Sequence, residues 1–299
     1  MKGSSKPDWI RAKIPTETKF KEVSNLIKNQ GLHTVCEEAF CPNRTECWES
    51  GTATFLLMGV YCTRACKFCD VDTKNPHQYL DIGEPLKIAE AIKTLSLKYV
   101  VLTSVTRDDL PDGGASHLAN CIRTIKQEMP STLIEILIPD FKGNVQSLKT
   151  IANAKPEVIG HNMETTETFT PKIRDPRAKY QQSLSVLKTL KNIDPEIFTK
   201  SSIMLGFGET DKQILTSLKD LKDVHVDIIT LGQYLQPSRK AIPVHDYIEP
   251  KKFAYWENKA KEMGFSAVVA GPLVRSSYQA GLQYSRVRKI VRKKLNEQE

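Results

Sequence analysis

Short apolar stretches rich in β-branched residues recur along the chain, and amphipathic segments separate them. The apolar stretches are at 53–60, 99–105, 132–138, 157–161, 198–205, 226–231 and 266–270. Apolar residues recur with helical period at 85–97, 115–128, 144–153, 179–191, 210–222 and 250–263. Because strands that alternate with helices of this length form parallel units with right-handed crossovers, the pattern predicts an α/β fold.

Six strand-and-helix units favour a partial (βα)6 barrel of the TIM type over a closed eight-fold barrel. Two helix starts carry clear signals, since Pro85 falls in a first turn and Thr210 can cap the helix that follows it. We expect an N-terminal extension at 1–50, the barrel at 51–270 and a C-terminal segment at 271–299. Both extensions are expected to cap the barrel mouth.

Polar residues and glycines follow each of the first six expected strands. They are Cys62, then 104–109, Pro139 with Asp140, 161–164, 206–209, and Gln233 with Tyr234. Polar loops in general would explain one or two such positions, but hardly all six. Since parallel α/β sheets place their chemistry at the carboxyl ends of strands, we expect the active site there.

The composition is that of a globular chain, with 26% charged residues and a net charge of +8. The longest apolar run, at 52–60, is far shorter than the roughly 20 residues of a membrane span, so no membrane association is expected. The N-terminus has no apolar signal core, which predicts a cytoplasmic protein. Part of the positive charge lies in a basic run at 285–299. A solvated terminal helix explains this run better than a nucleic-acid partner, because no aromatic-rich nucleic-acid motif accompanies it.

Six of the seven cysteines lie between positions 36 and 69. They form an upstream triplet, CEEAFCPNRTEC, and a downstream triplet, CTRACKFC: Cys36, Cys41 and Cys47, then Cys62, Cys66 and Cys69. In a reducing compartment such clusters indicate metal or redox chemistry rather than disulfides. Structural zinc needs four ligands, usually from two paired knuckles, and only one knuckle-like pair is present. Three thiolates on a four-iron cluster leave one iron free to bind something else.

The downstream triplet, with Phe68 before its last cysteine and a strand before its first, resembles the radical S-adenosylmethionine superfamily. The resemblance implies a [4Fe–4S] cluster on Cys62, Cys66 and Cys69. S-adenosylmethionine binds the fourth iron through its amino and carboxylate groups, and reduction yields a 5′-deoxyadenosyl radical.

A wider set of motifs resembles the lipoyl synthase family over nearly the whole chain. In order they are the upstream triplet, CTRxCxFCDV, SVTRDDLPDGGA, HNMET, LGFGET, DIITLGQYLQPS and GPLVRSSYQAG. Ala65 and Lys67 stand where the family more often has Arg and Pro, and they leave the cysteine spacing intact.

That resemblance implies a second, auxiliary [4Fe–4S] cluster on Cys36, Cys41 and Cys47. Its fourth iron ligand is expected to be Ser277, with Ser276 the less favoured choice. The implied activity is that of a sulfurtransferase, which inserts two sulfur atoms at C6 and C8 of an octanoyl group amide-linked to a lysine. Two molecules of S-adenosylmethionine are consumed, and the auxiliary cluster is sacrificed as the sulfur donor. No side-chain acid or base is expected to be catalytic.

Nine further residues are candidates for binding the cofactor: Ser104, Thr106, Arg107, Asp108, Glu135, Asn162, Glu164, Gly206 and Gly208. The first four lie where the superfamily contacts the methionine end, and Glu135 is a candidate for the ribose. The two glycines either let the backbone approach the adenine or only serve a turn with positive φ. For His161 a structural role is at least as well supported as a catalytic one, and Cys121 is expected to be a small buried residue.

The resemblance implies macromolecular partners. These are octanoylated lipoyl carrier domains (the E2 subunits of 2-oxoacid dehydrogenases and the glycine cleavage H protein), an electron donor such as flavodoxin or ferredoxin, and an iron–sulfur carrier for cluster repair. Two other functions remain open from the residues. One is a radical sulfur-inserting enzyme similar to biotin synthase, which would lack the upstream triplet and the RSSY segment. The other is a zinc-stabilised, basic RNA-binding protein, which would be colourless and bind about one zinc per triplet.

Overall fold

The computed structural model describes residues 6–11, 18–38, 41–49 and 53–296. Its eight strands form one sheet in chain order, and β2 to β8 are parallel to one another. The parallel strands are β2 (Thr54–Leu57), β3 (Tyr99–Ser104), β4 (Leu133–Leu137), β5 (Val158–Gly160), β6 (Phe198–Leu205), β7 (Ile228–Gln233) and β8 (Ala267–Gly271). All seven expected strands are therefore present.

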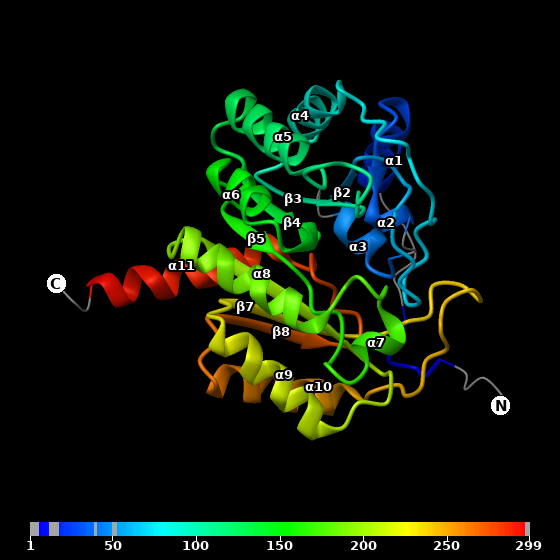
Figure 1. The fold of residues 1–299 in the computed structure, drawn as a ribbon, viewed down its shortest axis with the longest axis vertical. Helices are drawn as coiled ribbons and strands as arrows, with labels where there is room; N and C mark the ends of the chain where they lie inside the picture. The colour runs from blue at the N-terminus through cyan, green and yellow to red at the C-terminus, as the bar shows by residue number, and fades with distance from the viewer. Residues whose placement is uncertain (1–5, 12–17, 39–40, 50–52, 297–299) are drawn as a thin grey trace.

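Six long helices cover the outside of the sheet (Figure 1). They are α4 (Glu84–Thr94), α5 (Ala115–Glu128), α6 (Val145–Asn153), α8 (Tyr180–Ile193), α9 (Asp211–Asp223) and α10 (Pro250–Glu262). Pro85 lies in the first turn of α4, and Thr210 and Gln213 form a capping box at α9, as the sequence predicts. Among the described residues no strand pairing joins β8 back to the first strands, so the barrel is partial, as expected.

The N-terminal extension packs beside β2. It contains α1 (Thr18–Asn29), α2 (Val35–Glu38) and α3 (Arg44–Glu49), together with β1 (His33–Thr34), which pairs antiparallel with β2. Trp48 is fully buried against Phe20, with ring centroids 4.9 Å apart. The core of the extension is continuous with the core under β2 to β5. Burial of this apolar surface holds the upstream triplet against the barrel.

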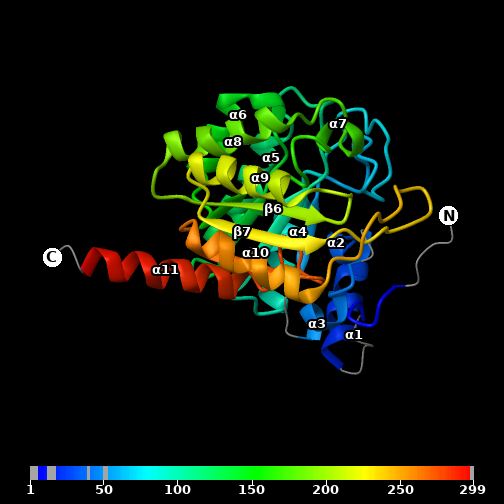
Figure 2. The same ribbon diagram turned by 90° about the horizontal axis from the view of Figure 1, so that it is seen from below.

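The C-terminal part divides between the two ends of the barrel. Residues 272–279 lie beside the N-terminal extension, whereas α11 (Ala280–Asn296) runs away from the body (Figures 1 and 2). Tyr284 and Val287 of α11 pack against Val158 and Ile228, the first residues of β5 and β7. The basic tail is therefore helical, as predicted, but it packs against the amino end of the strands instead of the mouth.

The elements outside the prediction are α1, α2, α3 and β1 of the N-terminal extension, together with α7 (Thr170–Ile173) and the 3₁₀ turn η1 (Phe141–Gly143). All of these except α1 are too short to show a period in the sequence. No helix of the described chain has the length and apolar character needed to cross a bilayer. The boundaries after residues 50 and 270 stay predictions.

Candidate functional site at the barrel mouth

The loop that carries the downstream triplet leaves β2 through a fixed turn. Met58 has a positive φ of 64°, and its N–H donates to the carboxylate of Glu84 at 3.0 Å. Its carbonyl accepts a hydrogen bond from Arg107 at 3.3 Å. Because the N–H and the carbonyl of Met58 are both hydrogen-bonded, the path of the chain from β2 toward Cys62 is fixed at this residue.

The cysteine loop is bonded to several loops at the barrel mouth. Lys67 N–H donates to the Ile173 carbonyl at 2.8 Å, and the Lys67 carbonyl accepts from Ile242 N–H at 2.9 Å. The Thr63 hydroxyl donates to the Thr106 carbonyl at 2.9 Å. The strand ends therefore determine the path of the loop.

The downstream thiols fit an iron–sulfur cluster by their donor chemistry. None of the seven cysteines, all of which lie in the described part of the chain, forms a disulfide. Two backbone N–H groups point at sulfur, from Arg64 to Cys62 Sγ at 3.4 Å and from Asp175 to Cys66 Sγ at 3.3 Å. Hydrogen bonds of this kind tune iron–sulfur sites. Burial raises the pKa of Cys69 to about 12, and the nearby thiols of Cys66 and Cys62 act in the same direction. The three groups therefore gather in one partly desolvated place.

The upstream thiols are gathered in the same way. Cys41 N–H donates to the Cys36 carbonyl at 3.2 Å, and Cys47 N–H donates to the Asn43 carbonyl at 2.9 Å. Burial, followed by the neighbouring Cys41, raises the pKa of Cys36 to about 11. Burial, followed by Cys36 and Cys41, raises the pKa of Cys47 to about 12. The thiols are therefore neutral without a metal, and a soft metal centre that binds them as thiolates would displace their protons to solvent.

The RSSY segment lies against the upstream triplet. Asn43 donates to the Leu273 carbonyl at 2.5 Å, and the Tyr278 hydroxyl donates to Glu46 at 3.1 Å. Arg275 is close enough to Cys41 to lower the pKa of that thiol against the effect of burial. Ser277, which precedes Tyr278 directly, thus belongs to the segment that adjoins the triplet. Its role as an iron ligand stays a prediction.

Two of the candidate cofactor residues carry buried polar atoms that have no partner among the described residues. These atoms are Ser104 Oγ and Asn162 Oδ1. Asn162 Nδ2 donates to Glu164 at 3.1 Å, and burial raises the pKa of Glu164. Since buried polar groups are nearly always bonded, these atoms fit a site that receives a polar ligand.

Other candidates already have strong partners within the protein. Arg107 is fully buried and donates to Asp109 at 2.9 Å, and Asp108 accepts from Arg64. Glu135 lies in the middle of β4 and is bonded to Lys200 at 2.8 Å and to Tyr99 at 2.8 Å. These contacts supply a structural role for each residue, while cofactor contact by any of them stays a prediction.

The glycine turn after β6 requires glycine for a backbone reason. Gly206 has φ 111°, and a Cβ there would lie 2.2 Å from Gln233 Nε2. Glu209 accepts the N–H groups of Gly206 and Phe207 at 3.0 and 3.1 Å. The positive φ and the close approach of Gln233 account for Gly206, and Gly208 has a φ of 100°.

Both ring nitrogens of His161 are bonded. Nδ1 donates to the Ile138 carbonyl at 2.9 Å, so Nε2 accepts from the Ser183 hydroxyl at 2.9 Å. Ser183 in turn accepts from Arg174 at 2.9 Å. His161 therefore belongs to a buried chain of hydrogen bonds that fixes Arg174 beside Glu164. Burial lowers the pKa of Arg174, and the nearby charge of Glu164 opposes this effect. Cys121 is fully buried, as expected, in α5 beside Glu84.

Sequence reasoning missed the charged residues that hold the loops at the mouth. Arg64, Arg174, Asp175 and Arg177 all bond to the cysteine loop or to the strand ends. The position of Arg64 inside the cysteine motif CTRACKFC was the available signal for it. The other three come from the stretch IRDPR, which has no periodicity.

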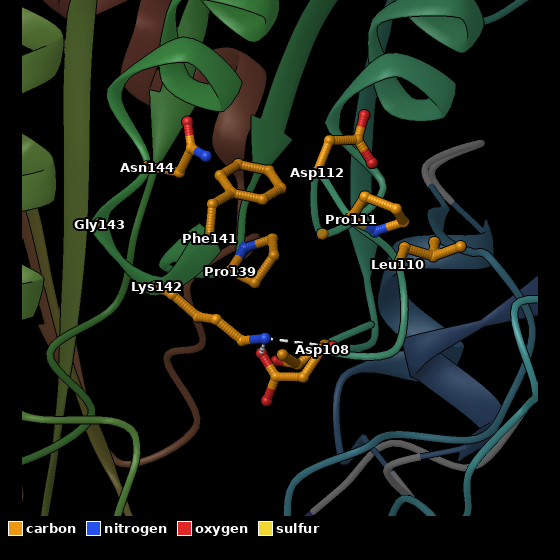
Figure 3. A pocket seen from close by; sticks show the side chains of 11 residues that line it. Asp108, Leu110, Pro111, Asp112, Pro139, Phe141, Lys142, Gly143 and Asn144 are labelled. Atoms are coloured by element: carbon orange, nitrogen blue, oxygen red, sulfur yellow. Dashed lines mark hydrogen bonds and ion pairs between the residues drawn. The ribbon is translucent and has the colours of Figure 1, made fainter.

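A cavity of about 310 Å³ opens between the loops that follow β3 and β4 (Figure 3). Phe141, Pro139 and Pro111 form its apolar wall. Lys142 reaches across it and donates to the Asp108 carbonyl at 3.1 Å. The cavity therefore borders the loop after β3, whose Thr106 and Asp108 are bonded to the cysteine loop.

Solved structures support the fold. The crystal structure of methylornithine synthase has a TM-score of 0.55 at 14% identity, and covers 84% of this chain and 72% of that one. The structure of Streptococcus suis SuiB bound to its precursor peptide SuiA has a TM-score of 0.57 at 10% identity, and covers 84% and 52%. Residues 56–221 match the profile of the Radical SAM superfamily. Fold and cysteine loop thus define a radical S-adenosylmethionine protein.

Closer relatives specify the family. Lipoyl synthase of Thermus thermophilus is 51% identical over 276 residues, which is 92% of this chain and 85% of the relative. Lipoyl synthase of Methanocella arvoryzae is 48% identical over 281 residues, or 94% and 95% of the two chains. Residues 2–41 match the N-terminal domain of lipoyl synthase. The chain belongs to the lipoyl synthase family, which disfavours both the biotin synthase-like and the zinc-stabilised alternatives.

Proposed function

We propose that this chain inserts two sulfur atoms at C6 and C8 of a protein-bound octanoyl group. In this proposal Cys62, Cys66 and Cys69 hold the cluster that binds S-adenosylmethionine. The upstream triplet and Ser277 hold the auxiliary cluster. When bound, these groups supply hydrogen-atom abstraction and sulfur, and the protein supplies position and exclusion of water.

One observation carries the assignment of two roles to the two triplets. The C-terminal segment that contains Ser277 is bonded through Tyr278 and Leu273 to Glu46 and Asn43, which lie within the segment of the upstream triplet. The downstream loop is bonded to the ends of the barrel strands, where Ser104 and Asn162 offer unpartnered polar atoms. This division supports an oxygen ligand at the first site and a polar cosubstrate at the second.

The charges between the two sites support a shared reaction chamber. Arg275 interacts electrostatically with both Cys41 of the upstream triplet and Glu164 at the end of β5. Arg174, fixed by Ser183, also faces Glu164. These side chains lie between the triplets and can orient polar groups there.

The macromolecular partners are also part of the proposal. The substrates are octanoylated E2 subunits and the glycine cleavage H protein, reduction comes from flavodoxin or ferredoxin, and an iron–sulfur carrier rebuilds the auxiliary cluster. We place the reaction in the cytoplasm, because a reducing compartment keeps six clustered cysteines available as ligands.

An anaerobic assay with octanoylated carrier protein tests the function. Mass spectrometry of the carrier should show the addition of two sulfur atoms, and two fewer hydrogens once the two thiols are oxidised to a ring. Iron and sulfide analysis of the protein before turnover should give about eight irons per chain. Intact clusters with an unmodified carrier would overturn the substrate assignment. About four irons per chain would overturn the second cluster.

A further inference from the structure

Arg64 lies inside the downstream motif, between Cys62 and Cys66, and it is buried, with 5% of its surface exposed. Its guanidinium donates to both oxygens of Asp140, each at 2.7 Å. It also donates to both oxygens of Asp108, at 2.9 and 3.0 Å. Two bidentate pairs on a single arginine are the most directional ion-pair geometry that side chains offer.

The two carboxylates belong to the rigid part of the barrel. Asp108 follows β3, and its N–H donates to the Thr63 hydroxyl at 2.9 Å. Asp140 follows β4, is 1% exposed, and accepts the N–H of Lys142 at 2.9 Å. Gln182 of α8 donates to the same carboxylate at 2.5 Å. Arg64 therefore fastens the cysteine loop to two neighbouring strand ends.

A second set of bonds holds the other side of the loop. Asp175 accepts the N–H of Ala65 at 2.9 Å, and Arg177 donates to the Thr63 carbonyl at 2.7 Å. Arg177 also pairs with Asp108 at 3.2 Å. Arg64 and Arg177 thus share Asp108, so the two sets form one network around residues 63–65.

We infer that Arg64 is a positioning residue that holds the loop of the downstream cysteines in place before the cluster binds. This inference rests on the proposed function, because it assumes that the loop receives a cluster. The side chain of Arg64 points to the carboxylates while its backbone N–H points to Cys62 Sγ. Fixing the side chain therefore also fixes an N–H···S bond to the first ligand.

The geometry requires arginine in particular. Lysine has the same charge, but it is a single point donor and cannot form two planar forks at once. An Arg64→Lys variant keeps charge balance with Asp108 and Asp140 while losing the orientation of the loop. Arg64→Gln loses both. The two variants separate a requirement for charge from a requirement for direction.

Hydrogen exchange on cluster-free protein tests the inference without relying on activity. In Arg64→Gln, the amides of residues 62–69 should exchange at least about tenfold faster than in the unsubstituted chain, with β3 and β4 unchanged. Arg64→Lys should fall between the two. Arg123→Gln, an exposed arginine on α5, is the matched control and should not change exchange in the loop. Exchange within twofold of the unsubstituted chain in a folded Arg64→Gln protein would overturn the inference.

A second measurement uses the loaded loop. After anaerobic reconstitution, Arg64→Gln should retain at most about half the iron of the downstream site. Its electron paramagnetic resonance signal with S-adenosylmethionine should be broadened by mixed ligand arrangements. If Arg64→Gln does not fold, Asp108→Asn serves instead, because the fork to Asp140 remains. An unchanged signal in folded Asp108→Asn and Arg64→Lys proteins would contradict the inference.

The two proposals fail in different ways. If the unsubstituted chain takes up no iron on the downstream triplet, the proposed function fails, whatever the exchange data show. If it takes up iron normally and the Arg64 variants do so equally well with equal exchange, only the positioning role fails.

Discussion

The hydroxyl of Tyr278 donates to Glu46 at 3.1 Å, although 232 positions separate the two residues in the chain. Asn43 and Leu273 make a parallel contact across 230 positions. Glu46 adjoins Cys47 and Tyr278 adjoins Ser277, so the two hydrogen bonds bring a C-terminal serine into the neighbourhood of the upstream triplet. The two hydrogen bonds therefore hold residues 273–278 against the segment that carries the upstream triplet.

Replacing Ser277 should separate sulfur insertion from the cleavage of S-adenosylmethionine. Ser277→Ala is expected to lose at least about tenfold in sulfur insertion, because the fourth iron of the auxiliary cluster loses its protein oxygen. Ser276→Ala is the matched control and should stay within about twofold. Mass spectrometry of the octanoylated carrier gives the readout. Equal loss in both variants, or loss only in Ser276→Ala, would reject the choice of Ser277.

Ser277→Cys tests whether a hard oxygen ligand matters. A thiolate suits iron better than an alkoxide, so the auxiliary cluster should release sulfide less readily. We expect iron content to be kept, with sulfur insertion reduced at least about tenfold while S-adenosylmethionine is still cleaved. Sulfur insertion at the unsubstituted rate would show that a labile oxygen ligand is unnecessary.

Tyr278→Phe should loosen the contact between the ends of the chain. Loss of one hydrogen bond to a charged acceptor costs about 1–2 kcal/mol in the free energy of unfolding. Chemical denaturation measures this cost, and chelator-induced loss of iron from the upstream site should accelerate. Tyr79→Phe, at a tyrosine that is 73% exposed, should change neither quantity. Unchanged iron loss in Tyr278→Phe would mean that the contact does not support the triplet.

His161 should make stability depend on pH below neutrality. Burial, with Arg174 nearby, lowers the pKa of His161 from 6.5 to about 4. The unfolded chain binds a proton at His161 more readily than the folded chain does, so neutral His161 contributes to the free energy of unfolding. This contribution is fully present above about pH 6.5 and is lost as the pH falls toward 4, at about 1.4 kcal/mol per pH unit. His161→Gln should flatten the pH dependence of the unfolding free energy in that window. A slope equal to that of the unsubstituted chain would exclude His161 as its source.

The buried pair of Glu135 and Lys200 should be structural. Both side chains are nearly inaccessible, and their atoms lie 2.8 Å apart. Lys200→Met should cost about 3–5 kcal/mol because it leaves Glu135 uncompensated, whereas Lys200→Met combined with Glu135→Leu should recover much of that loss. Denaturant unfolding measures both. If the double variant is stable but binds S-adenosylmethionine at least tenfold more weakly, Glu135 contacts the cofactor as the sequence suggests.

The strands and helices of the barrel could be predicted because burial imposes a period on them. Segment 226–231, for example, overlaps β7 at 228–231, and all six residues of β7 are buried. The sequence pattern did not predict β1, α7 and η1, because a strand of two residues or a single helical turn has no period. The sequence pattern also did not predict where α11 packs, because its apolar face does not reveal which end of the barrel it covers.

The two cysteine triplets could be recognised because their spacing is local, and their role as iron ligands stays a prediction. The network around Arg64 could not, because it joins residues 44 and 76 positions apart in the chain, on loops with no periodicity. Asp108 illustrates the difference. Its place after a strand predicts a ligand contact, whereas in the structure it pairs with Arg64 and Arg177.

The central claim is that the upstream triplet stores the sulfur that the enzyme inserts. The most direct test reconstitutes the protein with sulfide labelled with a heavy sulfur isotope, removes free sulfide, and allows one turnover on octanoylated carrier. The mass of the carrier should show two sulfur atoms, both heavy. Two light sulfur atoms, supplied from the medium, would contradict the account.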